Sequence, residues 1–138
     1  MITLCEKGIK SANVGGTSPI LTDGLTQYKL RIGGVAADDK YLGDQVLWLI
    51  PSKNTEAIKY LLKGNPFIYI LKNCYYRAVF VDSEEYEDRK EFLRSLNYSN
   101  CLNIEGTKIF CFRGEDVISE WLKETGCENI DVIRYNIK

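Results

Sequence analysis

Two apolar runs separated by only two residues place the strongest constraint on this fold. Phe67–Leu71 and Cys74–Val81 are each about as long as a strand, and only Lys72 and Asn73 lie between them. So short a connection joins antiparallel strands, because parallel strands need a crossover of about a dozen residues or more. Both runs lack regular polar alternation, so we expect both arms of this hairpin to be central in a sheet.

Amphipathic segments alternate with the apolar runs and predict three helices. Their apolar residues recur every three or four positions, which places them on one helix face. Asn54 or Thr55 suits the N-cap of the first helix, and Ser83 suits that of the second. Gly64 and Gly126 suit the ends of the first and third. The expected helices cover residues 55–64, 83–96 and 115–126.

The remaining apolar segments predict strands. Tyr28, Leu30 and Ile32 alternate with charged residues, which is typical of a strand with one face in water. A second hairpin is expected to turn at Glu105 and Gly106. Strands outside the first hairpin are expected over residues 2–9, 28–32, 46–50, 101–104, 107–112 and 130–137.

Together these elements predict a single α+β domain over residues 1–138. A chain of 138 residues is of the usual size for one domain, and it needs neither a metal nor a disulfide to fold. Three helices that each follow a strand predict three helices packed on one face of a mainly antiparallel or mixed sheet. A ferredoxin-like core over residues 46–104 is the most specific architecture that this order favours.

The chain contains no histidine. Its absence excludes Ser-His-Asp and Cys-His nucleophilic arrangements and every metal site that uses histidine. Five cysteines are widely spaced without a C-x-x-C pair, which is atypical of thiolate zinc sites and disulfide frameworks. With no cofactor fingerprint either, the sequence favours a protein that is not an enzyme and that holds no metal or cofactor.

Charge and hydropathy exclude further classes. The chain has 18 basic and 19 acidic residues and a net charge of −1, with no basic run, which is atypical of nonspecific nucleic-acid binding. No apolar run approaches the roughly 20 residues that cross a bilayer, and the N-terminal sequence lacks the pattern of a signal peptide. We therefore expect a soluble, cytoplasmic protein without a membrane partner.

Residues 11–24 (SANVGGTSPILTDG) are the leading candidate for a binding loop. Loops longer than about 12 residues are uncommon in compact domains unless they are functional or disordered. Flexible backbone N–H groups, two hydroxyls and a nearby lysine have the chemistry to hold an anion. The candidate ligand-binding residues here are Lys10, Asn13, Gly15, Gly16, Thr17 and Ser18. The alternative is a connection with no chemical role.

Three arginines extend the candidate anion site. Arg31, Arg77 and Arg113 lie on or beside predicted strands, and arginines that face inward would suit a phosphate or carboxylate ligand. The N-termini of the predicted helices are less suited to an anion, because acidic residues already occupy their first turns.

Acidic residues after the first hairpin give an alternative site. Asp82 directly follows Cys74–Val81, and Glu84 and Glu85 come next. Clustered carboxylates are ligands that Mg²⁺ accepts, so a small divalent-metal-dependent enzyme acting on phosphate esters is the alternative function. The competing interpretation is that these acids only stabilise the start of the next helix.

Three hypotheses about function follow. The first is a non-catalytic binding module, such as an inhibitor or accessory protein, that engages a protein partner or a small anionic ligand through its N-terminal loops. The second is the metal-dependent enzyme described above. The third is a structural protein whose exposed sheet edges pair between copies into a homo-oligomer.

Overall fold

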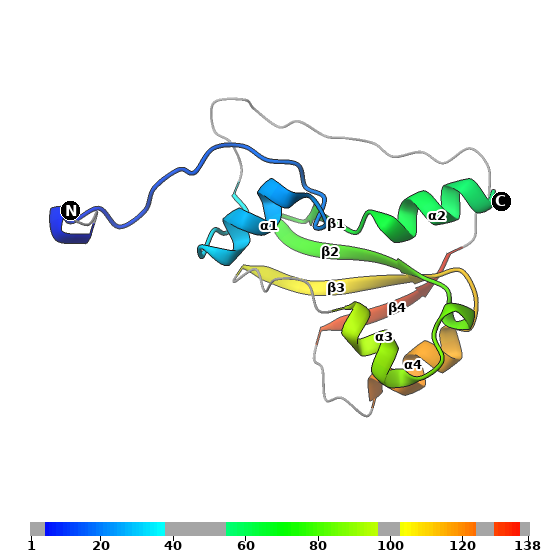
Figure 1. The fold of residues 1–138 in the computed structure, drawn as a ribbon. Helices are drawn as coiled ribbons and strands as arrows, with labels where there is room; N and C mark the ends of the chain where they lie inside the picture. The colour runs from blue at the N-terminus through cyan, green and yellow to red at the C-terminus, as the bar shows by residue number, and fades with distance from the viewer. Residues whose placement is uncertain (1–4, 38–54, 97–102, 124–128, 136–138) are drawn as a thin grey trace.

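A four-stranded sheet forms the centre of the molecule (Figure 1). The computed structural model describes residues 5–37, 55–96, 103–123 and 129–135. The strands are β1 Phe67–Leu71, β2 Cys74–Val81, β3 Ile104–Cys111 and β4 Ile130–Arg134. In the order β1-β2-β3-β4, β1 pairs antiparallel with β2, and the other neighbours are parallel. The predicted α+β class with a mixed sheet is confirmed, whereas the single domain over residues 1–138 stays a prediction.

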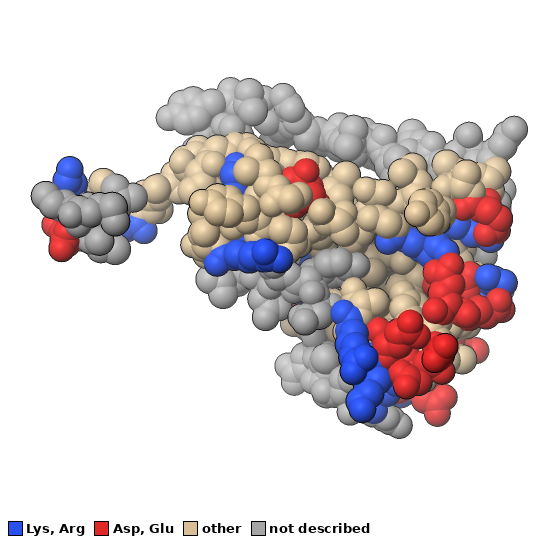
Figure 2. Space-filling view, in the orientation of Figure 1, with Lys and Arg blue, Asp and Glu red and all other residues tan. Residues whose placement is uncertain are grey.

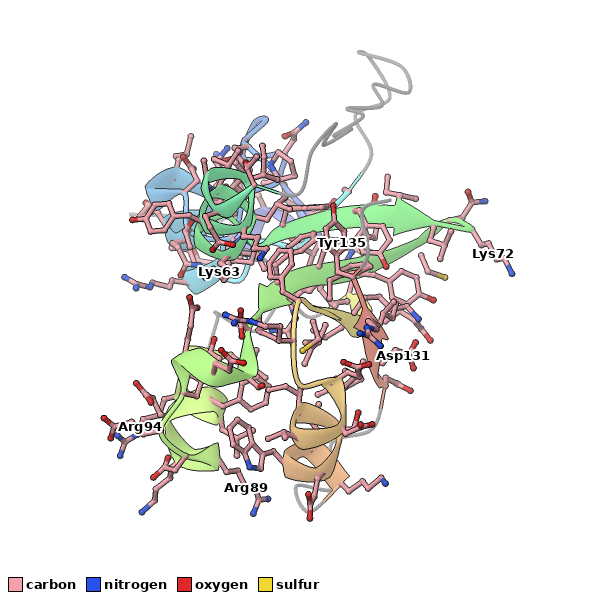
Figure 3. All side chains as sticks on the ribbon, turned by 90° about the vertical axis from the view of Figure 1, so that its right-hand side faces the viewer. Lys63, Lys72, Arg89, Arg94, Asp131 and Tyr135 are labelled. Carbon is pink, nitrogen blue, oxygen red and sulfur yellow. The ribbon has the colours of Figure 1, made fainter. Side chains whose placement is uncertain are left out.

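The β1–β2 hairpin has the connection that the sequence predicts. Lys72 and Asn73 have φ angles of 50° and 61°. Two-residue turns with positive φ at both positions have a twist that matches that of the flanking strands. Lys72 lies at the tip of the hairpin, away from the helices (Figure 3).

Two helices cover one face of the sheet. α3 (Arg89–Ser95) lies between β2 and β3 in the chain, and α4 (Glu115–Lys123) lies between β3 and β4. Side chains alternate between the two faces of a strand, so alternate residues of β2 and β3 pack against these helices. This main core consists of Val79, Val81, Phe92, Ile109, Cys111, Ile118 and Leu122.

α2 (Glu56–Gly64) covers the opposite face. Its buried Leu62 packs against Ala78 and Phe80 of β2 in a second apolar cluster. Lys63 on α2 and Arg94 on α3 accordingly lie on opposite sides of the sheet (Figure 3). The predicted packing of three helices on one face is thus only approximately confirmed.

The ferredoxin-like core predicted over residues 46–104 is also matched only approximately. A hairpin is followed by a β2–α3–β3 crossover, and the two strands of that crossover are parallel neighbours. The predicted strand over residues 46–50 lies outside the described residues. So do positions 2–4, 54, 101–102, 124–126 and 136–137 of other predicted elements.

The second predicted hairpin is wrong. Ile104–Cys111 is one strand that continues through Glu105 and Gly106. A Cβ at Gly106 would lie 2.6 Å from the carbonyl oxygen of Asn129. This glycine therefore permits close approach to the residue before β4, instead of forming a turn.

The predicted strand over residues 28–32 is wrong as well. Residues 28–31 belong to the helix α1 (Gly24–Arg31), which begins after Asp23, and Ile32 is its C-cap. The side chain of Asp23 accepts a hydrogen bond from Thr26 N at 2.9 Å. This N-cap starts a helix, and a residue pattern that alternates over only five positions does not outweigh it.

Two smaller elements also differ from the prediction. Cys5–Lys7 form the 3₁₀ turn η1 where a strand was expected. Ser83 begins only the short 3₁₀ helix η2 (Ser83–Glu85), and α3 starts later, after Asp88, which accepts from Glu91 N at 2.8 Å. In the part of the chain that the structure describes, no helix has the length and apolar character of a membrane span.

Candidate functional site

The C-terminal half of residues 11–24 is attached to the edge of the sheet. Ile20 forms an antiparallel bridge with Phe67 of β1. Leu21 is fully buried, and its N–H donates to the carbonyl of Pro66 at 2.7 Å. This part of the candidate loop is therefore integrated into the domain, next to β1.

Lys29 of α1 fixes the glycine-containing half of the loop. Its Nζ donates to the carbonyl oxygens of Gly15 and Gly16, both at 2.7 Å. Gly15 has a φ of 80°, which glycine adopts without strain. Its N–H donates to Asn13 Oδ1 at 2.7 Å. One side chain of α1 thus holds the turn over residues 13–16.

Thr26 of α1 fixes the two hydroxyl residues. Its Oγ1 donates to the carbonyl of Ser18 at 2.7 Å and lies 2.8 Å from Thr17 Oγ1. Thr26 is buried, so these contacts join the loop closely to the helix. The structure therefore brings five of the predicted loop residues together at α1, whereas Lys10 lies on the exposed stretch before them.

These contacts weaken the case for an anion in the loop. Two glycine carbonyls face the Lys29 ammonium, so the nearest fixed cation is already paired with acceptors. Asn13 takes up the N–H of Gly15. An anion pocket needs converging N–H or O–H donors. In residues 13–18 the described contacts instead turn the carbonyls of Gly15 and Gly16 toward Lys29. The ligand-binding role of these residues stays a prediction.

The three candidate arginines occupy three separate positions. Arg31 is exposed in the last turn of α1. Arg77 lies in β2, and its Nε donates to Thr107 Oγ1 of β3 at 3.0 Å. Arg113 follows β3 and pairs with Asp82. The pairing of Arg113 places it at the carboxyl end of β2 and β3, not in the loop.

The three candidate carboxylates each face a cation. The Asp82 side chain is only 3% exposed and accepts from Arg113 Nε and Nη2 at 2.8 and 2.7 Å. That hydrogen bond is the main reason why the pKa of Arg113 is raised. Glu84 lies 2.6 Å from Arg113 Nη1, and Glu85 pairs with Lys63. These acids therefore act as ion-pair partners that join η2 to β3 and α2.

The same end of the sheet gives no support to the metal-dependent enzyme. Within the described residues, no three or more Cys, Asp or Glu side chains form a group that could hold a metal ion. Cys111 is buried, and its Sγ donates to the carbonyl of Arg113 at 2.8 Å. Burial is the main cause that raises the pKa of this thiol to about 11. It is therefore protonated and unreactive at neutral pH.

α1 presents an exposed apolar stripe. Leu25, Tyr28 and Ile32 are spaced by three and four residues, so they share one face of α1 and its C-cap. They are 53%, 61% and 56% exposed. A helix on the surface of a domain normally turns its apolar face to the core. In the described structure this face of α1 instead points to solvent.

Other exposed apolar residues lie shortly before and after the stripe in the sequence. Among the residues that the structure describes, half of the exposed large apolar residues lie between residues 9 and 35, among them Ile9, Val14 and Val35. Val14 belongs to the turn that Lys29 holds against α1. Acidic side chains gather over η2, α3 and α4, whereas the surface over α1 is mostly uncharged, with basic side chains along one edge (Figure 2).

This surface was not predicted from the sequence, because residues 28–32 were expected to form a strand. Two signals favour a helix there: Asp23 as an N-cap, and the spacing of Leu25, Tyr28 and Ile32. No family model, curated protein or solved structure matches the chain. Its function therefore has to be argued from the chemistry of its surfaces.

Proposed function

We propose that this protein is a non-catalytic binding module that engages a protein partner through α1. The observation that carries the proposal is the stripe of Leu25, Tyr28 and Ile32, in which half or more of each side chain is exposed. Apolar residues at i, i+3 and i+7 are the anchors with which helices bind the grooves of other proteins. Contiguous exposed apolar residues mark such interaction sites more often than scattered ones.

Burial of the stripe would contribute to the binding of a protein partner. Covering a Leu, Ile or similar side chain completely contributes about 1.5–3 kcal/mol, and about half of each stripe residue is still available for burial. Three neighbouring anchors thus offer a few kcal/mol of binding free energy. A tyrosine near the middle of the stripe is also a residue type that is enriched at binding hot spots.

The helix is held rigidly enough to serve as a preformed anchor. Buried Leu21 fixes the chain just before α1, and buried Thr26 binds the loop on the neighbouring face. Lys29 adds two further hydrogen bonds to the same loop. A preorganised surface loses less conformational entropy on binding, which favours affinity.

The paired state of the other candidate groups supports a non-catalytic role. Asp82, Glu84 and Glu85 are engaged with cations, and Cys111 is a buried, protonated thiol. The inhibitor or accessory role and the cytoplasmic location expected from the sequence belong to this same proposal.

Affinity capture with matched variants tests the proposal. Tyr28→Glu places a charge in the stripe, and Tyr60→Glu places the same charge on α2, where the tyrosine is 79% exposed. We expect wild-type protein and Tyr60→Glu to retain a common protein from an extract of the source cells, and Tyr28→Glu to lose it. Identical capture by all three proteins would overturn the role of α1.

A further inference from the structure

The two edges of the sheet differ in how they are covered. β1 and β4 form opposite edges (Figure 1). At the β1 edge the chain covers part of its own backbone, because Ile20 bridges to Phe67. Next to this bridge, Pro19 accepts a hydrogen bond from Ile68 N at 2.9 Å. In the part of the chain that the structure describes, no strand or bridge pairs with the outer side of β4.

Backbone hydrogen bonds show which groups of β4 point outward. The carbonyl of Asn129, directly before β4, accepts from β3 at 2.9 Å. The N–H of Tyr135, directly after β4, donates to β3 at 2.8 Å. In a parallel pair, the residues that bond to the neighbouring strand alternate with residues that do not. The N–H and C=O groups that point away from the sheet therefore belong to Ile130, Val132 and Arg134.

The charged side chains of β4 do not guard this edge. Proteins often protect an edge strand with proline, with a bulge or with charges that hinder an added strand. β4 contains no proline, and it pairs with β3 in a continuous register. Asp131 pairs with Lys108 of β3, and Arg134 Nη1 lies 3.4 Å from Glu115 Oε1 of α4. Both charged groups of β4 are thus engaged within the domain.

The faces beside β4 offer apolar contacts to an added strand. Ile133 is 38% exposed on the face that α2 partly covers. Ile130 and Val132 lie on the other face, where they are partly buried against the main core. Side chains of adjacent strands contact each other on each face of a sheet. An extended segment with apolar residues at alternate positions would therefore cover Ile133.

A second copy of β4 fits this edge poorly. Two β4 strands that pair about a twofold axis at Val132 would be antiparallel. Asp131 of each copy would then lie opposite Ile133 of the other, and Arg134 would lie opposite Ile130. Residues that lie opposite each other are in direct contact, so each of these pairs joins a charged side chain to an apolar one. The edge thus favours a segment with a different sequence.

We propose that the outer edge of β4 binds an extended segment of a partner protein, which adds to the four-stranded sheet as a further strand. The outward N–H and C=O groups of β4 supply the hydrogen bonds, and an apolar residue of the segment covers Ile133. This surface is separate from the α1 stripe, because the segment that leads into α1 is attached to the opposite edge, at β1. The chain therefore has a second binding surface.

Peptide selection on the whole chain tests this site. The probe is a phage-displayed library of random peptides about ten residues long, the length of a long strand. We expect wild-type protein to enrich peptides in which apolar and polar residues alternate. Synthetic copies should slow amide hydrogen exchange at Ile130, Val132 and Arg134. The proposal is overturned if no peptide is enriched, or if every enriched peptide leaves exchange at these three residues unchanged.

Proline at an outward position supplies the matched variant. Val132→Pro removes an N–H that points away from β3, and edge strands accept proline at such positions. It should weaken peptide binding at least about tenfold, whereas Val132→Ala, which keeps the N–H, should stay within about threefold of wild type. Arg134→Pro and Arg134→Ala repeat the comparison at the last residue of β4, and circular dichroism melts show which variants are folded. Equal binding by the folded proline and alanine variants would overturn the proposal.

Sedimentation velocity without peptide distinguishes a partner segment from a second copy. We expect no dimer that depends on the β4 edge, so Val132→Pro and Val132→Ala should sediment alike. If wild-type protein instead forms a dimer of twice the 15.8 kDa chain mass and Val132→Pro abolishes it, a second copy occupies the edge. That result would overturn the partner segment.

Discussion

Replacing Lys29 with methionine should release the turn over residues 13–16. The change removes the two hydrogen bonds from Nζ to the carbonyls of Gly15 and Gly16, each 2.7 Å long, and keeps an unbranched side chain. Each such bond contributes about 0.5–1.5 kcal/mol net at an exposed position. Their loss should lower the free energy of local opening by about 1–3 kcal/mol.

Amide hydrogen exchange measures this opening directly. The N–H of Gly15, which donates to Asn13, should exchange about 5- to 150-fold faster in Lys29→Met, since local opening controls its protection. Lys29→Arg should retain most of the protection because it keeps a cationic donor. Arg31→Met is the matched control, because it removes a cation from the same helical turn. Equal exchange in Lys29→Met and Arg31→Met would refute the reasoning.

Three further predictions concern the rest of the fold. Phe92→Ala should lower the free energy of unfolding by about 3–5 kcal/mol in urea titrations, because the ring is fully buried in the main core; a loss below about 1 kcal/mol would contradict that core. Asp82→Ala should lower the free energy of unfolding by about 2–4 kcal/mol, because it removes a buried carboxylate that accepts two hydrogen bonds from Arg113. Replacing the exposed Glu84 with alanine should lower it by less than about 1 kcal/mol. Equal losses from the two variants would argue against this geometry. At pH 8 about one thousandth of the Cys111 thiol is ionised, given its pKa of about 11, so alkylation followed by mass spectrometry should label the half-buried Cys74 before Cys111. Equal labelling rates of these two cysteines would count against a buried Cys111.

The parts of the fold that the sequence predicted well are those with an unambiguous local pattern. The β1–β2 hairpin followed from two apolar runs and a two-residue gap. α2 followed from its cap Thr55 and from the helical spacing of its apolar residues, which buries Leu62. In these segments the local sequence and the tertiary packing favour the same secondary structure, so a short stretch of sequence was enough to predict it.

The errors arose where a distant partner decides the local structure. Gly106 looks like a turn residue until Asn129 is known to lie against it, 23 positions later in the chain. The residues from Tyr28 to Ile32 fit strand alternation and helix spacing equally over a short window, and the Asp23 cap decided in favour of the helix. Sequence alone does not reveal which of these contacts form.

The candidate site was predicted in part. Its glycines and hydroxyl residues were found from composition, but Lys29, which holds them, was not. The ion pair between Asp82 and Arg113 joins the ends of two parallel strands, 31 positions apart. This ion pair could not be predicted without the strand order of the sheet. Without Arg113 as a known partner, the carboxylates after β2 looked available for a metal.

Site-specific photo-crosslinking tests the central claim, that the stripe of α1 is a protein-binding surface. A benzophenone amino acid replaces Tyr28 in one protein and Tyr60 in a control, both of which are exposed tyrosines on helices. After irradiation in the source cells, we predict a discrete crosslinked protein, either a second copy or another chain, from position 28 only. The same products from both positions, or none from position 28, would contradict the account.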